Sequence, residues 1–118
     1  MSFIVSERAA LLLESVLSRY QADAVFIHTM KSAEGYRCIA YPGIPRSTHE
    51  HEVVIASGIV FLFEKRVGIR ESGTWVLPFD LLIDVCEPSG EMLEIVASGP
   101  HPWGHPPFRT VSKEAFRV

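Results

Sequence analysis

The chain has 118 residues, of which 47% are hydrophobic and 21% are charged, and its formal net charge is −3. This length predicts one domain, and a composition this apolar excludes an intrinsically disordered protein. The slight acidity and the scattered basic residues argue against a nucleic-acid partner, which requires clustered Lys and Arg to displace phosphate counterions. The apolar fraction also predicts surplus apolar surface for a partner.

The sequence carries no pattern typical of a membrane span or a signal peptide. No apolar run is longer than Ile59 to Phe63, far short of the ~18 residues that a spanning helix needs. The first residues lack a basic start followed by a long apolar stretch. Cys38 and Cys86 form neither a disulfide framework nor a CxxC pair. We therefore expect no membrane association and a cytoplasmic location with both thiols reduced.

The first elements expected along the chain are a helix and a hairpin. Ser6 is a suitable N-cap for a helix from about 6 to 21, and Glu7 places a negative charge in its first turn. Apolar residues then recur at helical spacing on one face: Ala9, Leu13, Val16, Leu17 and Tyr20. Residues 24–30 and 36–41 are rich in strand-forming residues around a turn, which predicts a β-hairpin.

The segment 48–58 is ambiguous between helix and strand. Ser47 and Glu50 have the spacing of a helix capping box. The β-branched residues that follow favour a strand over 53–57, and 59–66 reads as a further strand. Gly58 would then be either a helix C-cap or a strand bulge.

Strict alternation of apolar residues predicts one strand from 74 to 86 with a single buried face. Pro78 within it requires an edge position or a bulge. Residues 87–90 form a predicted turn, and 92–98 a strand that pairs back. Four prolines between 99 and 108 exclude regular structure there, and 111–116 is expected to form a short turn of helix.

His49 and His51 are the strongest candidates for chemistry, because residues two apart project from the same face of a strand and neutral imidazoles bind transition metals. A third ligand would come from Glu50 or Glu52, or from His101 and His105 if the C-terminal segment folds back. The alternative is a solvated polar loop. With Gly43, the pattern Gly-x5-His-x-His resembles the start of the first cupin motif over about ten residues.

That resemblance implies a small β-barrel that holds a divalent transition metal through His49 and His51. The chain departs from the cupin pattern further on. Ile55 and Ala56 stand where that motif has a glutamate, and no Pro-Gly-His segment follows. The metal site, and a small metal-dependent enzyme built on it, are therefore the alternative hypothesis; the preferred one assigns the protein no cofactor.

The segment 99–118 is expected to form a Pro/His/aromatic strap or arm. Its candidate residues for a ligand or partner surface are His101, Trp103, His105 and Phe108. Alternating His and Pro in an extended segment would present the rings outward, and Trp is a typical interface anchor. The alternative is a strap that covers a sheet edge.

Three further groups of titratable residues are candidates for a functional role. Asp80 and Asp84 would share a strand face about 13 Å apart, too far for a pair of catalytic carboxylates. His28 is expected to be a hydrogen-bonded, partly buried histidine. The cluster Lys65, Arg66 and Arg70 would either bind an anion or keep a strand edge soluble.

Together these elements predict one α+β domain over residues 1–118, with an N-terminal helix packed on a curved antiparallel sheet of about five or six strands. The helix and the hairpin after it also resemble, over about 35 residues, the start of GAF or roadblock-type sensory and dimerisation domains. We expect a non-catalytic homo-oligomer, most simply a dimer, that binds a small apolar ligand or a protein partner.

Overall fold

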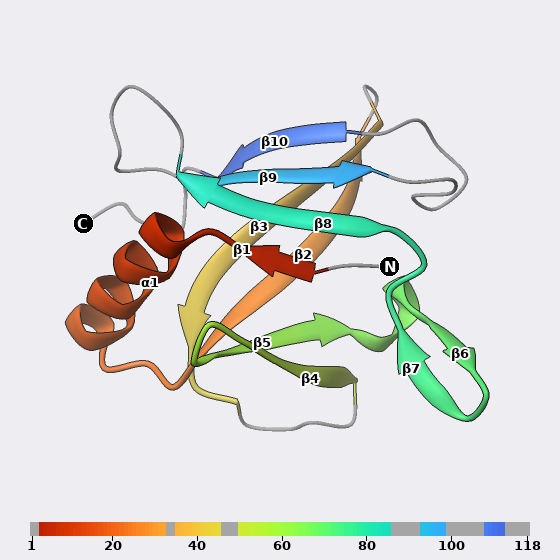
Figure 1. The fold of residues 1–118 in the computed structure, drawn as a ribbon, viewed down its shortest axis with the longest axis horizontal. Coiled ribbons are helices and arrows are strands. Elements are labelled where there is room, and N and C mark those ends of the chain that lie inside the picture. Colours follow the sequence, from red (N-terminus) through yellow and green to blue (C-terminus); the bar gives the residue numbers. More distant parts are fainter. Residues whose placement is uncertain (1–2, 33–34, 46–49, 86–92, 99–107, 113–118) are drawn as a thin grey trace.

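The fold is that of a computed structural model, which describes residues 3–32, 35–45, 50–85, 93–98 and 108–112. In chain order its elements are β1 (Phe3–Val5), α1 (Glu7–Tyr20), β2 (Ala24–Ser32), β3 (Gly35–Gly43), β4 (His51–Ala56), β5 (Ile59–Glu64), the 3-10 turn η1 (Lys65–Val67), β6 (Ile69–Glu71), β7 (Thr74–Val76), β8 (Asp80–Val85), β9 (Leu93–Ser98) and β10 (Phe108–Ser112). Figure 1 shows α1 at one end of the molecule and the β6–β7 hairpin at the other.

The strands form two four-stranded sheets, in the orders β1-β8-β9-β10 and β3-β2-β5-β4, and β6 pairs with β7 alone. The α+β class with an N-terminal helix is confirmed. The single antiparallel sheet of five or six strands is wrong, because β1 pairs with β8 and β2 with β5 in parallel. The cupin-like barrel stays a prediction: within the described residues the hydrogen-bonded ladders remain in separate sheets, although β10 lies beside β3.

Helix α1 begins and ends as the sequence predicts. Ser6 Oγ accepts a hydrogen bond from the backbone N–H of Ala9 at 3.2 Å, which caps the first turn. The same hydroxyl donates to Asp84 Oδ1 on β8 at 2.6 Å, and Arg8 Nε and Nη2 reach both oxygens of Asp84 at 2.7 and 3.0 Å. Asp84 therefore attaches the start of the helix to the first sheet through its bonds to Ser6 and Arg8.

Both hairpins of the second sheet are present. β2 and β3 pair in antiparallel register from Ala24 opposite Gly43 to Ser32 opposite Gly35. β4 and β5 are joined by Ser57 and Gly58, which both have positive φ (52° and 75°), as a two-residue hairpin turn requires. The strand interpretation is confirmed for 53–56, while Ser57 belongs to the turn, and the helix alternative is wrong for the described residues 50–58. Gly58 is a turn residue, neither a helix cap nor a bulge.

The predicted continuous strand from 74 to 86 is wrong, because the chain leaves the strand conformation at 77–79, where Pro78 lies. Its first part is β7, which pairs with β6 across a tight turn. The alternation nevertheless predicts burial correctly within the break and along β8. The buried positions are Leu77, Phe79, Leu81, Ile83 and Val85.

Three of the described strands, β1, β6 and β10, were missed by the sequence analysis. β1 adds a parallel edge to β8, and β10 pairs with β9 in antiparallel register. The expected helical turn over 111–116 is wrong at 111–112, which belong to β10; the rest of it, like the turn at 87–90, lies outside the described residues. Of the predicted C-terminal strap, residues 108–112 form a sheet strand.

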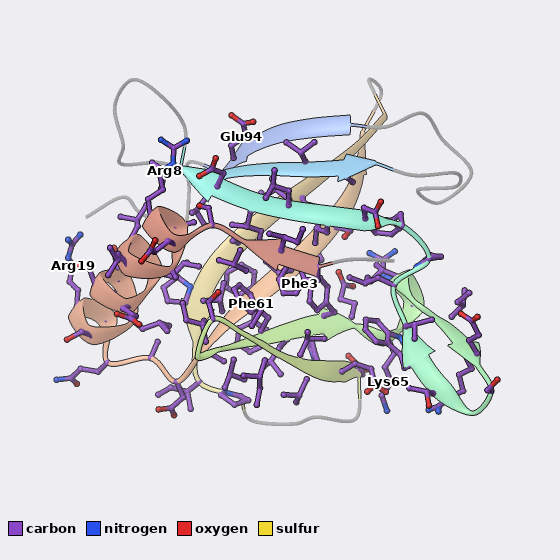
Figure 2. All side chains as sticks on the ribbon, in the orientation of Figure 1. Phe3, Arg8, Arg19, Phe61, Lys65 and Glu94 are labelled. Atoms are coloured by element: carbon purple, nitrogen blue, oxygen red, sulfur yellow. The ribbon has the colours of Figure 1, made fainter. Side chains whose placement is uncertain are left out.

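The core lies between the two sheets and under α1. Its largest fully buried side chains include Phe61 and Phe63 of β5 and Phe79, which precedes β8. The ring of Phe3 meets Phe61 edge-on, with centroids 4.9 Å apart (Figure 2), and it meets Phe63 in the same way at 5.3 Å. Because this core uses one face of the sheet β3-β2-β5-β4, the side chains of the other face, called the outer face below, point away from it.

Candidate functional site

The outer face of the second sheet carries an apolar row beside a polar row. The strand register places Phe26 of β2 next to Tyr41 of β3 and Leu62 of β5. One pair further along, Glu64 of β5 lies opposite His51 of β4. On β2, His28 is two residues beyond Phe26 and therefore shares its face. The parallel pairing of β2 with β5 thus brings His28 near Glu64, and the antiparallel pairing of β4 with β5 brings His51 there.

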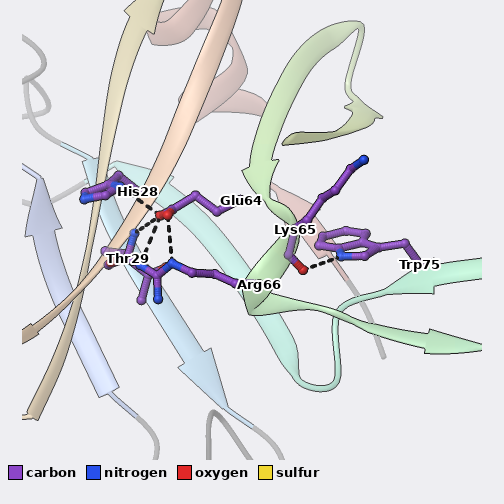
Figure 3. Close-up of polar contacts among 7 residues, drawn as sticks. His28, Thr29, Glu64, Lys65, Arg66 and Trp75 are labelled. Atoms are coloured by element: carbon purple, nitrogen blue, oxygen red, sulfur yellow. Dashed lines mark hydrogen bonds and ion pairs between the residues drawn. The ribbon is translucent and has the colours of Figure 1, made fainter. Parts of the chain in front are cut away.

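Glu64 is the centre of a polar network. Its Oε1 accepts a hydrogen bond from the backbone N–H of Thr29 at 3.1 Å and lies 2.8 Å from Nδ1 of His28. Its Oε2 accepts one from Arg66 Nε at 2.9 Å. Arg66 Nη2 also donates to the backbone oxygen of Thr29 at 2.7 Å (Figure 3). The turn that begins at Lys65 is thereby fastened to β2 through one carboxylate.

The electrostatics of the network keep Glu64 ionised. Burial acts to raise the pKa of Glu64, but the hydrogen bonds from Arg66 and Thr29 and the neighbouring positive charge outweigh it. The net result is a pKa below the usual value for a glutamate. The expectation for His28 is confirmed, since it is half-buried and hydrogen-bonded to this carboxylate.

Above this network lies an open pocket of about 540 Å³, called the His28–His51 pocket below. Its lining residues come from β2, β3, the start of β4, and the end of β5 with η1: His28, Tyr41, Glu50, His51, Glu64, Lys65 and Arg66. A volume of this size lies within the range typical of small-molecule sites.

Aromatic contacts hold two of the lining rings. Tyr41 stacks on Phe26 with centroids 5.3 Å apart and planes 4° apart, and His51 meets Phe26 edge-on, also at 5.3 Å. Burial and the charge of Glu64 raise the pKa of the Tyr41 hydroxyl, so that group is protonated at neutral pH. In the part of the chain that the structure describes, the buried Nδ1 atom of His51 has no hydrogen-bond partner.

Lys65 is fixed by its backbone while its side chain is exposed. The Lys65 N–H donates to the backbone oxygen of Glu50 at 2.9 Å, and the Lys65 oxygen accepts from Trp75 Nε1 at 2.9 Å (Figure 3). The Lys65 ammonium therefore extends from an anchored point at the edge of the pocket. The third member of the predicted basic cluster, Arg70, instead donates to the Gly73 oxygen in the β6–β7 turn at 3.2 Å and does not line the pocket.

Only some of the predicted site residues lie in the part of the chain that the structure describes. His51 lies in the pocket, whereas His49, His101, Trp103 and His105 fall outside the described residues. The backbone of Phe108 begins β10. In the part of the chain that the structure describes, no three His, Cys, Asp or Glu side chains are grouped so that they would hold a metal. The metal hypothesis depends on His49 and stays a prediction.

Sequence reasoning missed Glu64 and Tyr41 as site residues. The available signal was the alternation of β5, which places Glu64 on the face opposite Phe61 and Phe63. Asp80 and Asp84 are excluded as a pair by the bonds of Asp84 to Ser6 and the Arg8 guanidinium.

Comparisons with protein-family models and with curated proteins give no match for this chain. The described part of the chain contains no helix that is long and apolar enough to cross a membrane.

Proposed function

We propose that the protein is a small, non-catalytic binding module that takes a small ligand in the His28–His51 pocket. The observation that carries the proposal is the network around Glu64, which joins β2, β5 and η1 below the pocket. Side chains already held by such bonds lose little conformational freedom when a ligand arrives, and this favours binding. Because every lining residue carries a polar or charged group, we propose a polar ligand in place of the apolar ligand expected from the sequence.

The nature of the lining favours binding over catalysis by a hydroxyl or thiol nucleophile of Ser, Thr or Cys. Within the described residues the pocket lining contains no serine, threonine or cysteine that would act as a nucleophile. The thiol of Cys38 faces the core on β3, is 1% exposed, and has its pKa raised to about 11, mainly by burial. A thiol in this state is not activated for attack.

A thermal-shift screen of polar small molecules tests the proposal, with the His28→Ala variant as the site control. A ligand at 100 times its Kd adds about 2.7 kcal/mol to the free energy of unfolding, which is readily seen as a rise in Tm. We expect hits that lose their effect in His28→Ala. A screen without hits contradicts the proposal, and a shift by divalent metal ions alone that disappears in His51→Ala would support the metal hypothesis instead.

We further propose that the protein is a homodimer, with β4 at its interface. β4 is an edge strand of its sheet, and Val53 and Ile55 on its outer face are 50% and 70% exposed. Exposed edges with apolar side chains are typical sites of strand pairing. Beside β4, a groove of about 370 Å³ separates it from β7. Light scattering coupled to size exclusion tests this proposal.

The dimer experiment has a matched control. Ile55→Lys places a charge on β4, whereas Leu11→Lys places the same charge on the exposed side of α1, where Leu11 is 64% exposed. We expect a dimer that Ile55→Lys converts to monomer and Leu11→Lys leaves intact. A monomeric parent protein, or equal effects of both substitutions, would contradict an interface at β4.

A further inference from the structure

We propose that the ligand of the His28–His51 pocket is a small organic anion, whose carboxylate or phosphate is bound by Lys65 and Arg66 and whose planar apolar body lies against Tyr41. This inference rests on the proposed function, since it names the class of ligand for the same pocket. Some polar groups of the lining are already hydrogen-bonded within the protein, and the other polar groups are left to contact a ligand.

The carboxylate of Glu64 is already occupied. Each of its oxygens accepts at least one hydrogen bond, from Thr29 or from Arg66, and His28 lies 2.8 Å from Oε1. The guanidinium of Arg66 compensates its charge. Glu64 therefore does not provide the free negative charge that a cationic ligand would require.

The groups that remain available are mainly hydrogen-bond donors. The ammonium of Lys65 provides three N–H groups, and the second terminal nitrogen of Arg66, Nη1, lies beside the two guanidinium nitrogens that contact Glu64 and Thr29. Tyr41 adds a hydroxyl. These donors, together with the positive charge of Lys65, which Glu64 does not compensate, match the acceptor oxygens of a carboxylate or phosphate.

His51 contributes a further donor. Its Nδ1 is buried without a partner among the described residues, and an unpaired buried N–H is rarer and more costly in proteins than an unpaired acceptor. This favours the tautomer that carries the proton on Nε2 and leaves Nδ1 as a bare acceptor. Nε2 of His51 then offers an N–H group to the pocket that the ring lines.

The carboxylate of Glu50 and the ring of Tyr41 are the remaining lining groups that bear on the class of ligand. Glu50 is the remaining carboxylate of the lining, and it is exposed, so that water screens its repulsion of an anion. The ring of Tyr41 is 38% exposed and is backed by Phe26. A planar apolar group placed on this ring would gain aromatic contact in addition to the bonds of the anionic head.

Isothermal titration with ligands that share one ring and differ in the head group tests the inference. The probes are benzoate, phenyl phosphate, benzyl alcohol and benzylamine, with inorganic phosphate as the head group alone. We expect benzoate or phenyl phosphate to bind best, with an affinity that falls as salt rises from 50 to 500 mM because the attraction is screened. The ratio of the affinities for benzoate and phenyl phosphate distinguishes a carboxylate ligand from a phosphate ligand.

Two variants locate the binding. Lys65→Gln removes the ammonium and leaves the backbone bonds of that residue to Glu50 and Trp75 in place. Arg70→Gln removes the same charge from the β6–β7 hairpin, outside the pocket. We expect Lys65→Gln to weaken binding of the anion about tenfold, the factor that corresponds to the loss of one charge-assisted contact, and Arg70→Gln to change it less than about twofold.

The possible failures are distinguishable. Stronger binding of benzylamine or benzyl alcohol than of both anions overturns the assignment of an anion and leaves the proposed function standing. Equal affinities in Lys65→Gln and Arg70→Gln overturn the assignment of Lys65 as a ligand contact. If none of the probes binds and no compound of the thermal-shift screen binds either, the proposed function itself falls.

Discussion

Replacement of Glu64 by glutamine tests the network on which the pocket depends. The Glu64→Gln side chain has nearly the same shape but only one acceptor oxygen, and its amide group would face either Arg66 or the backbone N–H of Thr29. In the native protein those two groups donate to Oε2 at 2.9 Å and to Oε1 at 3.1 Å. The substitution therefore leaves a donor facing a donor on one side of the network.

The size of the effect follows from these contacts. Hydrogen bonds to a charged group contribute about 1.5–3 kcal/mol each, and the remaining amide oxygen retains one neutral bond worth about 1 kcal/mol. The Glu64 side chain is only 20% exposed, so screening by water is limited. We expect the free energy of unfolding to fall by about 2 kcal/mol at pH 7, and Tm to fall by about 8 °C for a domain of this length.

The lowered pKa of Glu64 also predicts how the stability loss in Glu64→Gln changes with pH. Because the pKa of Glu64 is lowered in the folded protein, its ionised form stabilises the fold at every pH above the unfolded value of about 4.3. This contribution is lost as the pH falls through the folded pKa. The difference in stability between the native protein and Glu64→Gln is thus largest near neutral pH and shrinks below about pH 4.

Urea denaturation followed by circular dichroism at pH 7 and pH 3 measures both effects. Glu14→Gln, on the exposed side of α1, is the matched control and is expected to change the stability by less than about 0.5 kcal/mol. A loss in Glu64→Gln no greater than in Glu14→Gln, or a difference that stays constant down to pH 3, would refute the reasoning.

Three further predictions concern the fold around the site. Asp84→Asn should lower the free energy of unfolding by about 1 kcal/mol at pH 7, a modest loss because its partner Arg8 is half exposed. The loss should shrink below about pH 4, because the pKa of Asp84 is held well below its usual range in the folded protein; urea titrations at pH 7 and below pH 4 check this. Gly68→Ala would place a Cβ 2.2 Å from the Trp75 ring, so we expect a loss of about 1–3 kcal/mol in the same assay. Cys38 should resist iodoacetamide at pH 7.5 until urea unfolds the protein, as measured by peptide mass spectrometry; rapid labelling of native protein would contradict its burial.

Local features of the sequence predicted the elements that form from local interactions. The cap at Ser6 and the periodicity after it define α1, and the strand residues on each side of 31–35 define the β2–β3 hairpin. The competing helical signal at Ser47 and Glu50 lost to the β-branched residues because Ser57 and Gly58 form a tight hairpin turn.

Long-range pairing accounts for most of what the sequence could not predict. β1 has three residues and gains its strand conformation from parallel pairing with β8, almost 80 residues away. Likewise, His28 meets Glu64 only because β2 and β5 run in parallel. A periodic pattern identifies the face of a residue but not the neighbouring strand. For this reason the sequence indicates His28, His51 and the Lys65–Arg66 pair separately and gives no sign that Glu64 bonds to His28 and Arg66.

The central claim is that the His28–His51 pocket binds a small anion. Titration of ¹⁵N-labelled protein with benzoate, followed by two-dimensional NMR, tests it most directly because each backbone amide reports on its own surroundings. The largest shift changes are expected at His28, Tyr41, His51 and residues 64–66, with β9 unaffected. Saturable changes centred on any other surface, or none at millimolar benzoate and phenyl phosphate, would contradict the claim.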